Sequence, residues 1–300
     1  MPSRVLATPD PIDIGLTLAP LQRGPGDPTM RMGREIWRTT HTPDGPATIR
    51  IAPRPGGIEV EAWGPGADEV LARATSLTGL EDDPGAFQPA DPLLRRLHAL
   101  RRGLRLARSG AVMEALIPAI LEQKVTGTEA YRAWRGLVIR YGEPAPWPAG
   151  EAGMRLAPTP AVLAGLPYYE FHPLEVERRR ADVIRRVCAM AAKLEAAGRE
   201  GPGPLSARLI AIPGIGPWTV AEVLVRALGD PDAVSVGDFH LPNLVSWALA
   251  GEPRGTDERM VELLEPYRGQ RARAVRLLET SGLRAPRYGP RMAPRSIASM

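Results

Sequence analysis

A glycine hairpin and an aspartate that follows it are the residues of this chain whose types and spacing could do chemistry. The hairpin is Pro213-Gly214-Ile215-Gly216, and apolar segments with helical periodicity lie on both sides of it. Its glycines can adopt backbone conformations closed to other residues, and Pro217 suits the first position of a helix. The N–H groups at such a helix start can bind an anion, so the sequence predicts a site for a DNA phosphate.

Asp238 lies 22 residues after Gly216, in the stretch Val-Gly-Asp-Phe-His, where we expect another helix to begin. Aspartate is a favourable N-cap residue, so helix capping alone could account for it. A capping carboxylate is also held at a fixed place, which suits a reaction that develops positive charge. We therefore interpret Asp238 as a candidate catalytic residue beside a phosphate-binding hairpin.

Arginine dominates the basic residues of a chain whose composition is otherwise that of an ordinary globular protein. The 300 residues have a formal net charge of +4, and every Lys or Arg position except Lys124 and Lys193 is an arginine. Two arginine-rich runs cover residues 95–108 and 178–186. Arginine forks match phosphate oxygens, but a GC-rich genome would give the same bias. The runs therefore predict either solvated helix faces or contacts with a nucleic acid backbone.

Several classes of protein and site are disfavoured by the sequence. No apolar run is long enough to span a membrane, and the N-terminus lacks the charged-then-apolar order of a signal peptide. We therefore expect a cytoplasmic, nucleoid-associated protein. Cys188 is the single cysteine, which fits a reducing compartment and excludes a four-cysteine zinc or iron–sulfur site within this chain. The four histidines show no metal-ligand spacing.

The order of elements predicts an α+β fold. Residues 1–90 are expected to form an antiparallel β-rich domain, in which alternating apolar and polar residues predict strands over 35–40, 47–52 and 58–63. Turn-forming residues separate these strands, and a helix is expected over 67–77. Residues 91–283 have helical periodicity, so we expect a helical domain there. A basic, partly disordered tail is expected over 284–300.

These motifs together resemble those of the helix-hairpin-helix–Gly/Pro–Asp superfamily of base-excision DNA glycosylases, and most of all its 3-methyladenine DNA glycosylase II branch. Residues 212–219 match the family hairpin, and Val236-Gly237-Asp238 matches its catalytic aspartate. Residues 119–125 resemble the helix that bears the DNA-probing loop, and Pro266-Tyr267-Arg268 lies where this branch often has Pro-Trp-Arg. The resemblance covers roughly residues 10–290 and implies an N-terminal antiparallel domain followed by a helical bundle with the active site in a cleft.

The resemblance implies roles for individual residues. Asp238 would face C1′ of the deoxyribose and stabilise the positive charge that develops as the glycosidic bond breaks. Gln123 or Lys124 would fill the gap left by the flipped base, and the sequence does not choose between them. The remaining DNA contacts would come from the hairpin and the helix after it, namely Gly214, Ile215, Gly216 and Thr219.

An aromatic pocket for the base and a cation site also follow from the resemblance. An alkylated purine is cationic, and an aromatic face attracts a cation. Trp218 is the first candidate and Tyr267 the second, while Tyr168 and Tyr169 are further candidates; core packing could explain each of them. A Na⁺ or K⁺ ion could be held by backbone carbonyls of Ile210, Ile212 and Ile215. No cofactor is required for the reaction.

The type of reaction depends on Trp218. Bifunctional members of the superfamily have a lysine at this position, which forms a Schiff base and cleaves the strand, whereas tryptophan has no nucleophilic amine. We therefore expect a monomeric, monofunctional glycosylase that flips alkylated purines, such as 3-methyladenine, out of double-stranded DNA and leaves an abasic site. The alternatives are a non-catalytic damage-binding protein and a glycosylase for other damaged bases.

Overall fold

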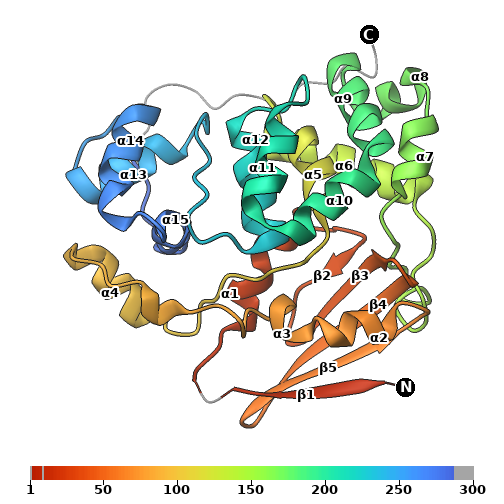
Figure 1. The fold of residues 1–300 in the computed structure, drawn as a ribbon, viewed down its shortest axis with the longest axis horizontal. Coiled ribbons are helices and arrows are strands. Elements are labelled where there is room, and N and C mark those ends of the chain that lie inside the picture. The colour runs from red at the N-terminus through yellow and green to blue at the C-terminus, as the bar shows by residue number, and fades with distance from the viewer. Residues whose placement is uncertain (1, 9, 287–300) are drawn as a thin grey trace.

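A five-stranded antiparallel sheet forms one side of the molecule, and helices form most of the rest (Figure 1). The computed structural model describes residues 2–8 and 10–286. The strand order is β1-β5-β4-β3-β2, and the strands are β1 Ser3–Ala7, β2 Met30–Arg31, β3 Ile36–Thr42, β4 Gly45–Arg54 and β5 Gly57–Trp63. The expected meander of three strands is confirmed as β3, β4 and β5, and the α+β class is confirmed with it.

The sheet is registered by its apolar residues. Ile36 pairs with Ile51 and Ile51 with Val60, and all three are buried on the face that packs against α1 to α3. Because side chains alternate along a strand, a shift of the register by one residue would move this set to the other face. The edge strands β1 and β2 were not expected from the sequence. Only Leu6 is buried in β1, and β2 has two residues, so neither has the alternation that predicts a strand.

The helices near the sheet are short. They are α1 Ile14–Leu18, α2 Ala67–Ala72 and α3 Ala74–Leu77, with 3₁₀ turns at Ala19–Leu21 and Pro84–Ala86. The single helix expected over 67–77 is therefore two, because Arg73 leaves the helical conformation at φ −95° and ψ 7°.

The remaining helices pack around two further cores. The larger core involves α5 Val112–Leu121, α6 Gly127–Tyr141, α7 Pro160–Gly165, α8 Tyr168–Phe171, α9 Arg178–Ala189, α10 Ala191–Glu200, α11 Pro202–Ile210 and α12 Pro217–Val223. A 3₁₀ turn at His172–Leu174 follows α8, and a π-helical segment at Leu224–Leu228 follows α12.

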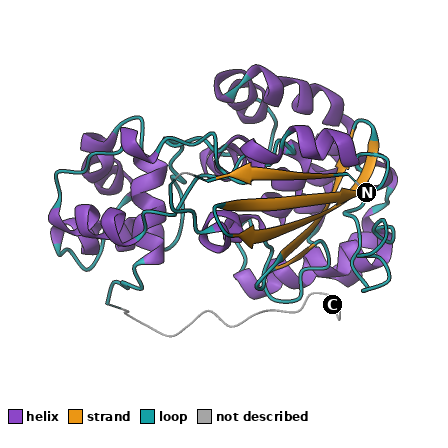
Figure 2. Ribbon diagram, turned by 90° about the horizontal axis from the view of Figure 1, so that it is seen from below, coloured by secondary structure: helices purple, strands orange, loops and turns teal. Residues whose placement is uncertain are grey.

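The smaller core is formed by α4 Pro92–Leu100, α13 Leu241–Ala250, α14 Asp257–Leu264 and α15 Arg271–Thr280, with a 3₁₀ turn at Glu265–Tyr267. Figure 2 shows this group of helices set to one side of the rest. Residues 229–240 connect the two helical cores, and Asp238 lies on this connection. Of the expected tail, residues 287–300 lie outside the described part of the chain. None of the described helices is long and apolar enough to cross a membrane.

Candidate active site and DNA-binding hairpin

The hairpin between α11 and α12 is a tight turn that requires glycine. Gly214 has φ +97°, a conformation that side-chain-bearing residues rarely adopt. A Cβ atom there would also lie 2.4 Å from Cγ2 of Val183 on α9. The N–H of Ile215 donates to the Ile212 carbonyl at 3.0 Å and closes the turn. Ile212 and Ile215 are buried, whereas Pro213 and Gly214 between them are exposed.

Two side chains from other helices hold the outer carbonyls of this hairpin. The amide of Gln123, two residues after α5, donates to the Gly214 carbonyl at 3.1 Å and to the Thr219 hydroxyl at 2.9 Å. The guanidinium of Arg186 on α9 donates to the Pro213 carbonyl at 2.7 Å. Lys124 is exposed and has φ +56°. The structure thus places Gln123 as a brace of the hairpin, and it leaves Lys124 as the exposed residue of the pair.

Asp238 is half-buried, and both of its carboxylate oxygens are engaged. Oδ2 accepts the indole N–H of Trp218 at 3.1 Å. Oδ1 accepts the backbone N–H groups of His240 at 2.7 Å and Leu241 at 2.8 Å, at the start of α13. The N-cap residue of α13 is His240, and Asp238, two residues before it, binds the backbone at the start of the helix; these bonds fix the carboxylate. The carboxylate thus accepts three hydrogen bonds in all.

The turn before Asp238 is fixed by backbone geometry. The Asp238 N–H donates to the Ser235 carbonyl at 3.2 Å, and Gly237 has φ +94°. The Gly237 N–H donates to Oδ1 of Asp257, in the first turn of α14, at 3.0 Å. The loop that carries the carboxylate is therefore held from α12 on one side and from α14 on the other.

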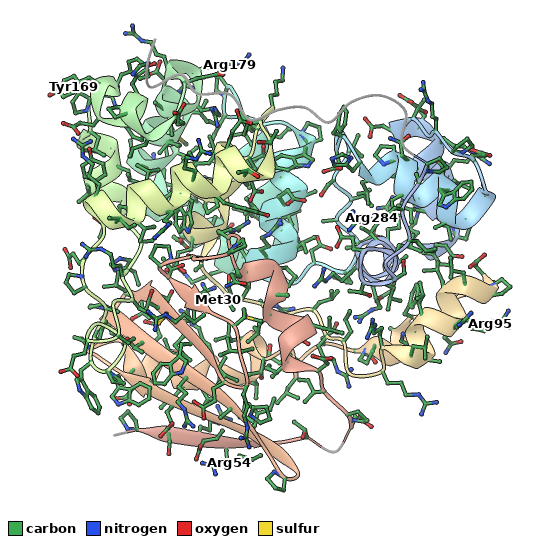
Figure 3. The ribbon with its side chains drawn as sticks, turned by 180° about the vertical axis from the view of Figure 1, so that it is seen from behind. Met30, Arg54, Arg95, Tyr169, Arg179 and Arg284 are labelled. Carbon is green, nitrogen blue, oxygen red and sulfur yellow. The ribbon has the colours of Figure 1, made fainter. Side chains whose placement is uncertain are left out.

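Of the expected aromatic residues, Trp218 is the one whose side chain contacts Asp238. Tyr267 packs against Phe87 in the smaller helical core, with ring centroids 5.8 Å apart, and burial raises its pKa. Tyr168 packs on His172 and lies under the Arg178 guanidinium, and Tyr169 is 70% exposed on α8. Figure 3 shows Tyr169 at the outer edge of the molecule.

Tyr168 contacts the start of α9, whereas the hairpin contacts α9 near its other end. Arg178, which covers Tyr168, and Arg186, which contacts the hairpin, are eight residues apart on α9, about 12 Å along the helix axis. The role of these two tyrosines in lining a base pocket remains a prediction. The sequence left their direction open because the position of α8 depends on how it packs against α9.

Phe239 was not singled out from the sequence. It directly follows Asp238, is 84% exposed and lies edge-to-face with His240 at 4.9 Å between ring centroids. Its position next to the candidate catalytic residue was the available signal. A large exposed aromatic side chain at this place is a candidate contact for DNA or for a base.

The two arginine-rich runs differ in their relation to the hairpin. Arg178, Arg179 and Arg186 are exposed on α9, the helix that contacts the hairpin. The run over 95–108 begins on α4, and Figure 3 shows Arg95 on a different side of the molecule from Arg179. Each run also has one buried arginine. Arg180 donates to the Leu121 carbonyl at 2.7 Å, and the buried Arg105 donates to the Pro11 carbonyl at 3.1 Å.

The expected cation site consists of backbone carbonyls alone. The Ile212 carbonyl already accepts the Ile215 N–H, so an ion would share that oxygen, and Ile210 is 49% exposed at the end of α11. The residues that the structure describes contain no group of three or more His, Cys, Asp or Glu side chains that could hold a metal ion. The Na⁺ or K⁺ site remains a prediction.

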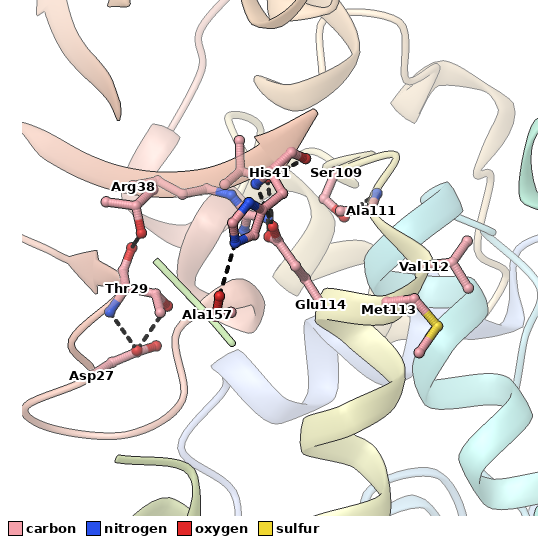
Figure 4. Close-up of polar contacts among 12 residues, drawn as sticks. Asp27, Thr29, Arg38, His41, Ser109, Ala111, Val112, Met113, Glu114 and Ala157 are labelled. Atoms are coloured by element: carbon pink, nitrogen blue, oxygen red, sulfur yellow. Dashed lines mark hydrogen bonds and ion pairs between the residues drawn. The ribbon is translucent and has the colours of Figure 1, made fainter. Parts of the chain in front are cut away.

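A cavity of about 260 Å³ lies between the sheet and α5, away from Asp238. Figure 4 shows the polar contacts at its wall, where Glu114 of α5 accepts hydrogen bonds from Arg38 at 2.6 Å and from the Thr40 hydroxyl at 2.7 Å. The imidazole of His41 lies 2.8 Å from the Ala157 carbonyl. Glu114 is near the start of α5, whereas Gln123 follows its end. We therefore interpret these contacts as the hydrogen bonds that hold the sheet against the larger helical core.

This α+β molecule contains a helix-hairpin-helix motif, in which a glycine hairpin joins α11 to α12. Trp218 on the second helix of the motif is hydrogen-bonded to Asp238. No protein-family model matches the chain. It is 29% identical over 212 residues to a probable bifunctional transcriptional activator/DNA repair enzyme AlkA of Mycobacterium tuberculosis, covering 68% of this chain and 42% of that protein. It is 27% identical over 172 residues to the putative DNA-3-methyladenine glycosylase YfjP of Bacillus subtilis, covering 55% of this chain and 58% of that protein. The chain thus spans less than two thirds of these relatives.

Solved structures have the same fold over almost the whole chain. The 3-methyladenine DNA glycosylase of Archaeoglobus fulgidus superposes with a TM-score of 0.76 at 20% identity, over 93% of this chain and 97% of that one. The 8-oxoguanine glycosylase/lyase of Clostridium acetobutylicum, solved with DNA, superposes with a TM-score of 0.66 at 12% identity, over 92% and 96%. In fold, in sequence relatives and in the hairpin–aspartate motif, this chain is similar to the helix-hairpin-helix DNA glycosylases.

Proposed function

We propose that this protein is a monofunctional DNA glycosylase that hydrolyses the N-glycosidic bond of alkylated purines, such as 3-methyladenine, in double-stranded DNA. The observation that carries the proposal is the fixed carboxylate of Asp238, bonded to Trp218 on the first turn of the helix that the hairpin opens. The sequence relatives named as a DNA repair enzyme and a DNA-3-methyladenine glycosylase support the same substrate class.

Asp238 would act by stabilising charge. Loss of the base leaves an oxocarbenium-like sugar, and a carboxylate that is already oriented stabilises it without reorganising during the reaction. A purine alkylated at N3 or N7 carries a positive charge in DNA and leaves readily, so one carboxylate can suffice. Asp238 could also orient the attacking water.

DNA is the proposed partner, and the hairpin is the proposed phosphate contact. The exposed backbone around Pro213 and Gly214 would approach a phosphate near the flipped nucleotide, and the start of α12 contributes a positive partial charge. Arg186, bonded to Pro213, adds a full positive charge at the same place. We propose that a bound Na⁺ or K⁺ is an accessory to this contact and that a monomer is the active form.

We propose hydrolysis without strand cleavage because neither of the two lysines occupies the position at which a lyase would need one. Lys193 is on α10, and Lys124 is on the exposed turn after α5. Neither occupies the α12 position that Trp218 fills. Lys124 follows Gln123, which contacts the hairpin, so it is the lysine that a lyase mechanism would have to use. Borohydride trapping on damaged DNA should therefore give no covalent adduct with wild type.

The decisive experiment measures base release from methylated duplex DNA, resolving N3-methyladenine and N7-methylguanine, for wild type and Asp238→Asn. Wild type should release base, and the variant should bind the DNA without releasing it. A wild-type protein that binds damaged DNA but releases no base would instead be a damage-binding protein. Parallel duplexes with 8-oxoguanine or hypoxanthine test the alternative of other damaged bases.

A further inference from the structure

The loop that carries Asp238 is attached to α12 at two points. Glu222 lies four residues after Trp218 on α12, so the two side chains project from the same face of the helix. The Ser235 hydroxyl donates to Oε1 of Glu222 at 2.5 Å, and Asp238 accepts from Trp218 at 3.1 Å. Ser235 is three residues before Asp238, so both ends of this short loop are bonded to one helix face.

Glu222 is itself held in place from the other side. Arg226, one turn further along, forms an ion pair with Oε2 of Glu222, and its Nε donates to the Pro20 carbonyl at 3.0 Å. The side chains of Glu222 and Arg226 are only 15% and 18% exposed, so their interaction is less screened than a surface pair. The chain of contacts therefore runs from the N-terminal segment through Arg226 and Glu222 to the Asp238 loop.

Ser235 and Asp238 lie where the chain passes from the larger helical core to the smaller one. A movement of one core relative to the other would displace this loop less if it were bonded to α12 at two points than at one. The bond from Ser235 to Glu222 is the second such bond, beside the bond from Trp218 to Asp238. Ser235 is 8% exposed, so water competes little for its hydroxyl.

We propose that Glu222 is a positioning residue for base release, which sets the register of the 235–238 loop on α12 and thereby the place of the Asp238 carboxylate; this rests on the proposed glycosylase function. Glu222 acts through Ser235 and does not itself contact the reacting atoms. Misplacement of a reacting group by about 1 Å can cost about 100-fold in rate, so loss of the tie should affect the chemical step more than binding.

The test compares Glu222→Ala, Ser235→Ala and the double variant with Glu262→Gln, an exposed control that breaks a surface pair with Arg259 on α14. Single-turnover base release and the Kd for DNA containing a tetrahydrofuran abasic analogue are measured for each. Ser235→Ala removes the tie without changing any charge, so it remains informative if Glu222→Ala destabilises the fold. Glu222→Gln keeps an acceptor for Ser235 and should recover part of the lost rate.

Both single variants should lower the single-turnover rate about 10- to 100-fold and change Kd less than about 3-fold. The double variant should be no slower than Glu222→Ala, because the two residues share one bond. Hydrogen exchange at residues 235–241 should rise in both variants and stay unchanged in the control.

The proposal is overturned if Ser235→Ala releases base at the rate of Glu262→Gln with unchanged exchange over 235–241. It is also overturned if the rate and the melting temperature fall while Kd rises in parallel, as for a purely structural residue. Absence of base release in wild type would instead count against the proposed function, and the exchange measurement would still test the tie.

Discussion

The indole N–H of Trp218 donates to Oδ2 of Asp238 at 3.1 Å and joins the first turn of α12 to the loop that carries the carboxylate. The same side chain therefore sits between the hairpin and the candidate catalytic residue. In this geometry Trp218 has two possible contributions, an aromatic face for the base and a hydrogen bond that orients the carboxylate. Substitutions that keep or remove the ring of Trp218 distinguish the two.

Asp238→Asn should abolish catalysis and keep binding. The amide cannot stabilise an oxocarbenium-like sugar by charge, so single-turnover base release should fall about 100- to 1000-fold. Binding to abasic-analogue DNA should be equal or tighter, because a negative charge beside phosphates is removed. The measurement is a rate and a Kd on the same duplex, with Glu262→Gln as an exposed control carboxylate on α14. Loss of binding in parallel with rate would mean that Asp238 is needed mainly to cap α13.

Trp218→Phe keeps an aromatic ring and removes the donor to Asp238. A hydrogen bond to a charged group contributes about 1.5–3 kcal/mol, so the rate of base release should fall about 10-fold or more. Trp218→Ala removes the ring as well and should also raise the Kd for DNA that carries a flipped base. If Trp218→Phe releases base as fast as wild type, the bond to Asp238 does not orient the carboxylate during the reaction.

The local parts of this site could be predicted from the sequence. The positive φ of Gly214 and the capping bonds of Asp238 to His240 and Leu241 follow from residues within a few positions of one another. Glycine conformations and N-caps are short-range effects, so the pattern Pro-Gly-Ile-Gly and the position of Asp238 were sufficient.

Contacts between distant residues could not be predicted in the same way. Gln123 reaches Gly214 across 91 residues, and Ser235 reaches Glu222 because the loop after α12 folds back on it. The contacts of Tyr168 with His172 and with the Arg178 guanidinium are further examples. Side-chain direction depends on how elements pack, and the composition of a single segment does not contain that information.

Gly214→Ala should destabilise the fold through the hairpin. The residue has φ +97°, and its new Cβ would lie 2.4 Å from Cγ2 of Val183. Strain of this kind costs about 1–3 kcal/mol in the free energy of unfolding, measured by denaturant titration. Adding Val183→Ala removes the clash but not the backbone strain. The double variant should therefore recover part of the lost free energy of unfolding, once the cost of the Val183→Ala single variant is subtracted. Gly203→Ala, where a Cβ meets nothing within 4 Å, is the control.

Cys188 should be unreactive while the protein is folded. The side chain is buried on α9, and burial raises the pKa of its thiol to about 12. Because the thiolate is the nucleophile, a thiol reagent at pH 8 should label it only after denaturant unfolds the chain. Mass spectrometry of labelled protein with and without denaturant measures this. Rapid labelling of native protein would show that α9 opens locally, and with it the contact of Arg186 to the hairpin.

Gln123→Ala and Lys124→Ala should weaken DNA binding for different reasons. Gln123 braces the Gly214 carbonyl and the Thr219 hydroxyl from within the protein, so its loss should raise Kd without changing the salt dependence of binding. Lys124 is exposed and positively charged at the adjacent position, so loss of a phosphate contact there should lower the slope of log K against log salt by about 1. Titrations over a range of salt concentrations distinguish the two, with Lys193→Ala as the control lysine on α10. An unchanged slope for Lys124→Ala with slower base release would instead assign Lys124 to the gap left by the flipped base.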